Sequence, residues 1–236
     1  MNHNKLTQKI TDFLEKNKGT KKVPCFDLDL INYNTAYNIQ LCVFELVKTG
    51  YAPGVILLLE HSPVITIGNN RSRNNLLAGE ENLKAQGIEL VQSNRGGDIT
   101  FHGPGQLVCY PIFNLNYFDK DLTQFVKNLE QIIIDTLIEY KIKGTRIDKF
   151  RGVFVDNYKI ASIGLHVKKW VTMHGFSFNI NINLDYFKNI IACGLKNHAQ
   201  TSLKKILNHN VSISDVKEQV LEKFAEIFNI KILKIK

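Results

Sequence analysis

Apolar residues recur with the spacing of an amphipathic helix in four stretches of the chain. The clearest repeat covers residues 121–140, and the last one covers residues 212–228. The other two cover residues 4–18 and 34–48. The pattern therefore predicts four helices, of which the first precedes every predicted strand.

Shorter apolar or alternating runs predict β-strands at residues 23–28, 55–59, 64–68, 88–92, 152–155, 159–164 and 171–183. The run 55–59 is apolar throughout, which indicates a central strand covered on both faces. In the last run Phe176 and its alternate neighbours are apolar, whereas Gly175 and Ser177 lie on the opposite face. Asp156-Asn157 separates two of the strands and predicts a tight hairpin.

Helices and strands do not alternate strictly along the chain, which favours an α+β class with mixed sheets and flanking helices. A length of 236 residues with 44% hydrophobic content is enough for one large domain with an appendage. Residues 1–22 are followed by a polar joint, so we expect an N-terminal helical extension over 1–22 and a single domain over 23–236.

A glycine-rich segment, residues 94–106, interrupts this pattern and contains four of the 15 glycines. Gly103-Pro104-Gly105-Gln106 predicts a type II turn, because proline fixes φ at the second position and glycine accepts positive φ at the third. Two strands would then meet at a corner where Arg95 and His102 face a ligand. An ordinary glycine-rich hairpin would have the same sequence features, so the segment alone does not distinguish a ligand-binding corner from a hairpin.

Composition narrows the setting of the protein. No apolar run approaches the roughly 20 residues that span a bilayer, and residues 1–22 lack the apolar core of a secretory signal. The four cysteines show no CxxC pair, which fits a reducing compartment. We therefore expect a cytoplasmic protein that does not bind membranes. A net charge of +8 would suit an acidic protein partner or nucleic acid, and charge alone does not choose between them.

Two residues are candidates for covalent chemistry. Cys193 precedes Gly194 at a turn, where its sulfur would be accessible, although a lone cysteine is more often a small buried apolar residue. Lys159 begins an apolar strand and would reach solvent in most proteins. Drawn inward it could act as an acid or base, and its charge beside a cysteine would favour the thiolate.

Other chemistries lack their motifs. The chain has no GxxxxGK[ST], GxGxxG, GxSxG or HExxH pattern. The histidines do not have metal-ligand spacing, so we predict neither a metal nor a cofactor. His61 before Ser62-Pro63 is interpreted as shaping a turn. For His174 two interpretations stay open, a ligand contact or, more often on a half-buried strand, a satisfied structural side chain.

Taken together, several segments resemble the lipoyl(octanoyl) transferases. Residues 95–106 resemble the RGGxxTxHGPGQ signature of that family, and residues 159–164 its K-x-x-[SA]-[IL]-G strand. Residues 174–179 resemble its H-G-x-[AS]-x-N segment, and Cys193-Gly194 its catalytic cysteine. Ala192 stands where proline is expected, and Phe101 where tyrosine is usual, but neither change removes a reacting group.

The resemblance implies a biotin/lipoate ligase-like fold and a two-step acyl transfer. Cys193 would attack an octanoyl thioester, and Lys159 would maintain the thiolate and later take a proton from the incoming amine. The donor would be octanoyl-acyl carrier protein. The acceptors would be lipoyl domains of 2-oxoacid dehydrogenases and the glycine cleavage H protein, and we expect the enzyme to be a monomer.

The family's acyl pocket maps onto three segments of this chain. Their residues are Arg95, Gly96, Gly97, Asp98, Ile99, Thr100, Phe101 and His102; Ser162, Ile163 and Gly164; and Gly175, Phe176 and Ser177. The alternatives are an ATP-dependent lipoate or biotin ligase, which needs no cysteine nucleophile, and a non-catalytic acyl- or nucleic-acid-binding module. The presence of both Cys193 and Lys159 favours catalysis, and the lack of a helix-turn-helix or aromatic-rich sheet motif argues against nucleic acid.

Overall fold

The computed structural model describes residues 3–69, 73–192 and 199–235. Its α-helices are α1 His3–Lys16, α2 Tyr33–Lys48, α3 Glu80–Ala85, α4 Leu122–Glu139, α5 Leu203–Leu207 and α6 Ile213–Phe228. Its strands are β1 Val23–Ile31, β2 Gly54–His61, β3 Val64–Ile67, β4 Glu89–Gln92, β5 Thr100–His102, β6 Gln106–Phe113, β7 Thr145–Ile147, β8 Phe150–Val155, β9 Tyr158–Lys168, β10 Val171–Asn179 and β11 Ile232–Ile235. Short 3₁₀ helices η1 Arg73–Asn75, η2 Leu115–Tyr117 and η3 Leu184–Asn189 lie between them.

The strands form two mixed sheets. The large sheet has the order β11-β1-β2-β6-β10-β9-β8-β7, with β1 parallel to β11 and β2, and antiparallel pairs from β2 onward. The small sheet has the order β4-β3-β5. The predicted class, mixed sheets with flanking helices, is confirmed.

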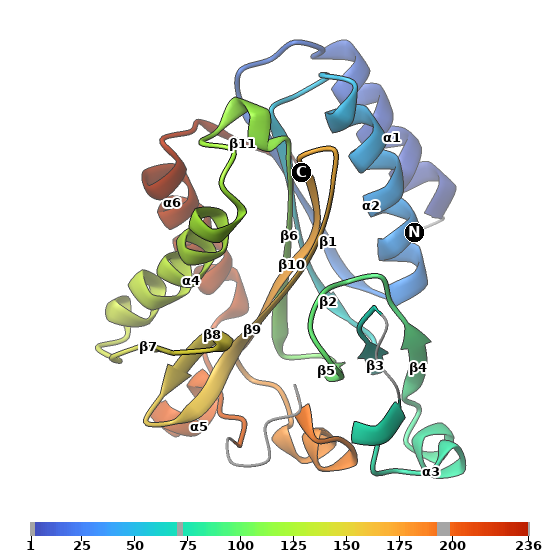
Figure 1. The fold of residues 1–236 in the computed structure, drawn as a ribbon, viewed down its shortest axis with the longest axis vertical. Coiled ribbons are helices and arrows are strands. Elements are labelled where there is room, and N and C mark those ends of the chain that lie inside the picture. The colour runs from blue at the N-terminus through green and yellow to red at the C-terminus, as the bar shows by residue number, and fades with distance from the viewer. Residues whose placement is uncertain (1–2, 70–72, 193–198, 236) are drawn as a thin grey trace.

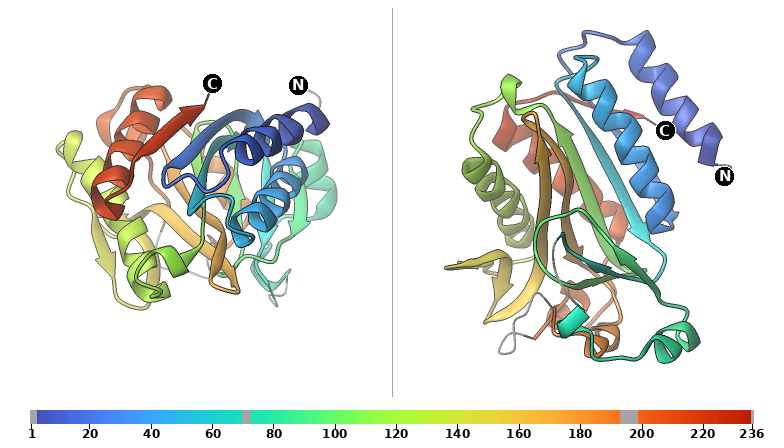
Figure 2. Two further views of the ribbon diagram at one scale, coloured as in Figure 1. Left: turned by 90° about the horizontal axis from the view of Figure 1, so that it is seen from above. Right: turned by 45° about the vertical axis from the view of Figure 1, so that its right-hand side comes forward.

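Helices cover both faces of the large sheet (Figure 1). α1 and α2 lie against one face and α4 and α6 against the other, while the small sheet lies at one end of the molecule (Figure 2). Each face has its own core. Ile56 and Leu58 of β2 point into the core shared with α4 and α6, and Leu57 and Leu59 into the core shared with α1 and α2. The prediction that β2 is a central, doubly covered strand is therefore confirmed.

The four predicted helices are all present, within a few residues of the expected ends. The strands β7 and β11 and the short helices α3 and α5 were not predicted, because each is too short to show a resolvable period. The interpretation of His61 as a turn residue is wrong: it is the last residue of β2 and is fully buried. Its ring is hydrogen-bonded to the Tyr110 hydroxyl. Tyr110 is distant in sequence, so the residues next to His61 could not predict this contact.

The extension α1 packs on α2 through Ile10 and Leu14, both buried in the core of that face. The division of the chain at residue 22 stays a prediction. Among the residues described, no helix is both long and apolar enough to cross a bilayer.

Candidate active site

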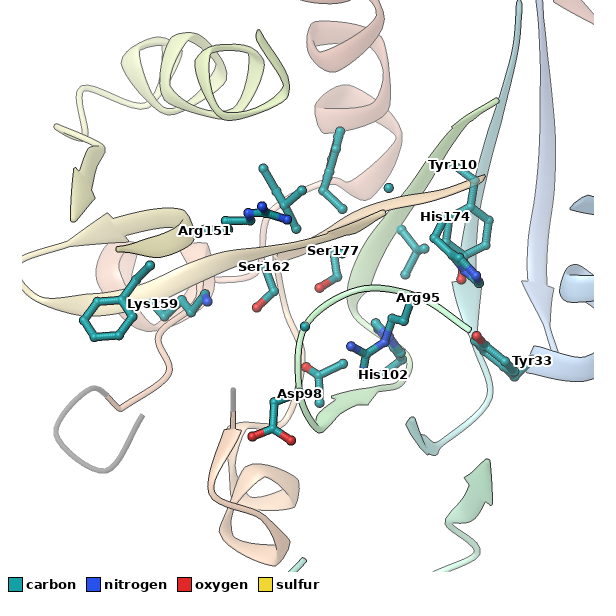
Figure 3. A pocket seen from close by; sticks show the side chains of 18 of the residues that line it. Tyr33, Arg95, Asp98, His102, Tyr110, Arg151, Lys159, Ser162, His174 and Ser177 are labelled. Atoms are coloured by element: carbon teal, nitrogen blue, oxygen red, sulfur yellow. The ribbon is translucent and has the colours of Figure 1, made fainter. Parts of the chain in front are cut away.

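A cavity of about 510 Å³ lies between the large sheet and the glycine-rich segment (Figure 3). Its floor is formed by small side chains of β9 and β10, of which Ser162 pairs with Ser177 and Gly164 with Gly175. The residues that complete its wall are Tyr33, Arg95, Gly97, Asp98, Thr100, His102, Val108, Tyr110, Lys149, Phe150, Arg151, Lys159, Ile163, His174 and Phe176. The three segments named from the sequence are thus brought together around one hollow.

The glycine-rich segment approaches the sheet at backbone distance. The Gly96 amide donates a hydrogen bond to the Leu165 carbonyl at 2.8 Å. A Cβ on Gly164 would lie 2.7 Å from the Gly96 carbonyl oxygen, which is closer than real contacts allow. Glycine at both positions therefore fixes the distance between the cavity floor and its roof. The predicted type II turn is also present, since Gly105 has φ of 86° and the Gln106 amide bonds the Gly103 carbonyl.

A β-bulge turns Lys159 into this cavity. Val153 pairs with Ala161 but Phe154 pairs with Lys159, so Ile160 is an extra residue in β9. In a regular strand Lys159 and Ser162 would lie on opposite faces. The bulge reverses the alternation, so Ile160 and Ala161 both enter the core while Lys159 shares the cavity face with Ser162 (Figure 3).

Lys159 is held on several sides. Only 2% of its surface is exposed, and its Nζ lies 5.4 Å from the centre of the Phe154 ring. Its backbone amide donates to the Ala199 carbonyl, and its carbonyl accepts from the Thr201 amide, both at 2.9 Å. The chain that follows residues 193–198 is thereby fastened directly to Lys159. Cys193 itself lies outside the described residues.

The bulge depends on Gly152 and on a buried carboxylate behind it. Gly152 has φ of 122°, and a Cβ there would lie 2.2 Å from the Ala161 carbonyl and 2.9 Å from Lys159 Cε. The Gly152 amide donates to Glu130 Oε1 at 3.0 Å, and Arg146 Nε donates to the other oxygen of Glu130 at 2.9 Å. Glu130 therefore anchors the start of β8 to α4, and Gly152 leaves the space that Lys159 needs.

We expect Gly152→Ala to lower both stability and activity, because the new Cβ displaces the backbone of the bulge and the stem of Lys159. Gly87→Ala is the matched control, since Gly87 also has positive φ but open space around it. Backbone strain alone should cost the control about 1–2 kcal/mol. Chemical denaturation and turnover are measured for both variants. Equal stability and equal turnover in the two would contradict this account of the bulge.

Arg95 and His102, which were predicted to face a ligand, both line the cavity and are both buried. Arg95 Nε and Nη2 donate to Thr66 Oγ1 at 3.0 and 2.8 Å, and Nη1 donates to the Gly96 carbonyl at 3.0 Å. Gln106 donates its amide hydrogens to carbonyl oxygens, so its Oε1 accepts from His102 Nδ1 at 2.7 Å. These bonds hold the glycine-rich segment in shape.

Three buried imidazoles surround the end of the cavity away from Lys159. His61 Nδ1 faces the Ile31 carbonyl, so this nitrogen carries the hydrogen, and Nε2 accepts from the Tyr110 hydroxyl at 2.7 Å. His174 Nε2 lies 2.6 Å from Asn94 Oδ1. Burial lowers the pKa of His61 to about 4 and that of His174 to about 3, and it holds the pKa of His102 well below its usual range. All three are neutral at pH 7.

These histidines should make the protein less stable in mild acid. Their pKa values are depressed in the folded state, so the unfolded chain binds more protons below about pH 6.5. The stability that is present above pH 6.5 is lost as the pH falls toward 4, by up to roughly 1.4 kcal/mol per pH unit for each histidine. Urea unfolding from pH 7 to 4.5 measures this slope. His174→Gln should reduce it, whereas His209→Gln, at an exposed position, should not. An unchanged slope in both variants would refute the assignment.

Not every residue named from the sequence reaches the cavity. Ile99 and Phe101 are fully buried in a separate core with the small sheet and η3, where Phe101 packs on Tyr186 and Phe187. Strand alternation explains this, because the neighbours Thr100 and His102 point into the cavity instead. Gly96 shapes the roof through its backbone.

Other residues that build the cavity were not predicted from the sequence. Tyr33 and Tyr110 line the cavity, and Glu130 supports β8 from behind. Tyr33 opens α2 and Tyr110 lies within an apolar strand, so their local sequence reads as ordinary core. Glu130 offered one signal, an acid on the apolar face of a predicted helix, which in a folded protein requires a partner.

Two of the cysteines that the structure describes, Cys25 and Cys109, are poor nucleophiles. Burial raises the pKa of Cys25 to about 12 and that of Cys109 well above its ordinary value. Both are therefore protonated core residues, as expected for most lone cysteines.

Known proteins define the class to which this fold and cavity belong. Residues 32–225 match the model of the lipoyl protein ligase A/B catalytic domain. A putative lipoate protein ligase of T. acidophilum with bound lipoic acid superposes with a TM-score of 0.71, covering 91% of this chain and 89% of that one at 14% identity. A lipoate-protein ligase A bound with ATP gives a TM-score of 0.70 at 14% identity, with 92% and 89% covered. These likenesses establish the fold.

Relatives with similar sequences identify the family more narrowly than the structural matches do. An octanoyltransferase of Clostridium kluyveri is 43% identical over 205 residues, covering 87% of this chain and 88% of the relative. An octanoyltransferase of Thermoanaerobacter sp. is 45% identical over 211 residues, covering 89% and 92%. The chain belongs to the octanoyltransferase family.

Proposed function

We propose that this protein transfers an octanoyl group from a thioester donor to a lysine of lipoyl domains, as a step of protein lipoylation. The observation that carries the proposal is the bulge in β9. It buries Lys159 in a cavity of about 510 Å³ whose floor is made of glycine and serine residues. The relatives named octanoyltransferase supply the reaction class. The proposed donor is octanoyl-acyl carrier protein, and the proposed acceptors are lipoyl domains of 2-oxoacid dehydrogenases and the glycine cleavage H protein.

In the first half-reaction the Cys193 thiolate attacks the thioester carbonyl, an S-acyl bond forms, and the donor thiolate leaves. Lys159 supplies the positive charge that favours the thiolate and a proton for the leaving sulfur. In the second half-reaction the acceptor amine attacks the S-acyl group, Lys159 takes the amine proton, and Cys193 leaves. The backbone hydrogen bonds between Lys159 and residues 199–201 support these roles for Cys193 and Lys159, because they tie the chain that follows Cys193 to Lys159.

The cavity suits a medium alkyl chain for two reasons. Its floor is built from Gly164, Gly175 and small serines, which leave room above the sheet. The two histidines that line it, His102 and His174, are uncharged, so the chain does not displace water from an imidazolium. Each buried methylene contributes ~0.8 kcal/mol, which gives most of the affinity for the acyl group.

The opening of the cavity is basic. Lys149 and Arg151 line it and are exposed, and Phe150 between them is 38% exposed. Such a rim would attract acidic carrier domains and orient them on encounter. We propose that residues 23–236 carry out catalysis; the family match, which starts at residue 32, leaves α1 outside.

Transfer without ATP tests this function. The protein is mixed with octanoyl-acyl carrier protein and a lipoyl domain, with no nucleotide, and acylation of the domain is followed by mass. Transfer under these conditions supports the proposal. Acylation that requires free octanoate and ATP would instead identify a ligase, and no acylation under either condition would leave a binding module.

A further inference from the structure

The cavity has one open end and one closed end. At the open end lie exposed residues, among them Lys149 and Phe150. At the other end lie Tyr33, Tyr110 and His174, whose residue surfaces are 3%, 4% and 2% exposed. Lys159 and Tyr33 stand at opposite ends of the labelled residues in Figure 3, with Arg95 and Ser177 between them.

We propose that the Tyr33 ring is the stop that limits acyl-chain length, so that the site takes medium-chain acyl thioesters and rejects longer ones. The inference rests on the proposed function, which places the acyl carbonyl near Lys159. A chain that starts there and lies over Gly164 and Gly175 runs toward Tyr33 (Figure 3). Its methyl end would meet the closed wall.

Tyr33 is suited to this role because its ring cannot swing away. It is the first residue of α2, whose start is fixed by the Asn32 side chain accepting from the Thr35 amide. The Tyr33 hydroxyl lies 2.7 Å from Ser93 Oγ, so the far tip of the ring is also tied down. The ring also packs against His61, at 5.3 Å between centres.

The wall behind Tyr33 gives no alternative route. Tyr110 is bonded to His61, and His174 to Asn94, so each polar group already has a partner. A longer chain would have to break these bonds and leave buried polar groups unsatisfied, which costs free energy. Methylenes beyond the stop therefore gain no burial energy and meet a rigid obstacle.

The test is competition among acyl-pantetheine thioesters with six, eight, ten and twelve carbons, read as the acyl masses found on the protein. Wild type should be acylated mainly by the octanoyl thioester. Tyr33→Leu should shift the ratio of ten- to eight-carbon adducts upward by roughly tenfold, because two more methylenes can be buried. Tyr33→Trp should shift the preference toward six carbons, which keeps the test valid if the smaller side chain destabilises the fold.

Two controls separate a stop from a general disturbance. Tyr33→Phe removes the hydroxyl but keeps the ring, which the start of α2 and the contact with His61 still hold, so it should retain the octanoyl preference. Tyr37→Leu removes a ring that stacks on Tyr33 without lining the cavity, and it should also retain it. An unchanged adduct profile in both Tyr33→Leu and Tyr33→Trp overturns the inference while the transferase function stands. Absence of any adduct on wild type would overturn both.

Discussion

Lys159→Ala is expected to slow turnover by roughly 10²–10⁴, the range typical of a positioned acid or base. The structure gives the reason: the side chain is buried in the cavity and no other lysine lines its interior among the residues described, Lys149 being at the exposed rim. Both half-reactions should slow, because the same group is proposed to assist the leaving sulfur and the attacking amine. Single-turnover acylation and deacylation measure the two steps separately.

The fold should survive this change. Removing a buried amine also removes its desolvation penalty, so thermal unfolding should move little. Lys205→Ala is the control, because Lys205 contacts the nearby Tyr158 ring from the surface and does not line the cavity. It should turn over at the wild-type rate. Wild-type rates of both half-reactions in Lys159→Ala would end the acid–base assignment.

Cys193→Ala should abolish transfer altogether, since without a sulfur no acyl-enzyme can form. Cys25 and Cys109 cannot replace it, because both are buried with raised pKa values. Cys42→Ala is the matched control: Cys42 lies on α2 beside Thr11, away from the cavity. Its transfer rate should be that of wild type. Substantial transfer by Cys193→Ala, measured as octanoylation of a lipoyl domain, would exclude the cysteine mechanism.

Local pattern predicted the larger part of the fold, and the family resemblance supplied the three segments of the site. Alternation in β10 predicted that Gly175 and Ser177 share one face and that Phe176 points the other way. In the structure Gly175 and Ser177 lie on the cavity floor, and Phe176 packs in the core and also borders the cavity. The same rule accounts for the residues that do not reach the cavity: within the signature segment, Ile99 and Phe101 point away while Thr100 and His102 point in. The residues of the signature segment are consecutive in sequence, but only some of them line the cavity.

The inward position of Lys159 could not be derived from its own strand. It depends on the bulge at Ile160, which forms where Gly152 of the neighbouring strand allows the backbones to approach. Glu130, 22 residues earlier, holds that neighbour in place. Tyr33 and Tyr110 likewise reach the cavity through pairings with Ser93 and His61 that are distant in sequence. Such contacts arise from tertiary packing, which residue periodicity does not encode.

The thioester intermediate is the central claim, and intact-protein mass tests it most directly. Wild-type protein is incubated with octanoyl-acyl carrier protein in the absence of ATP and of any acceptor, and then digested to locate the adduct. The mechanism predicts a single octanoyl group on the peptide that contains Cys193, which disappears when a lipoyl domain is added and acylated. Transfer without any such adduct, or an adduct on another residue that is passed to the acceptor, would contradict it.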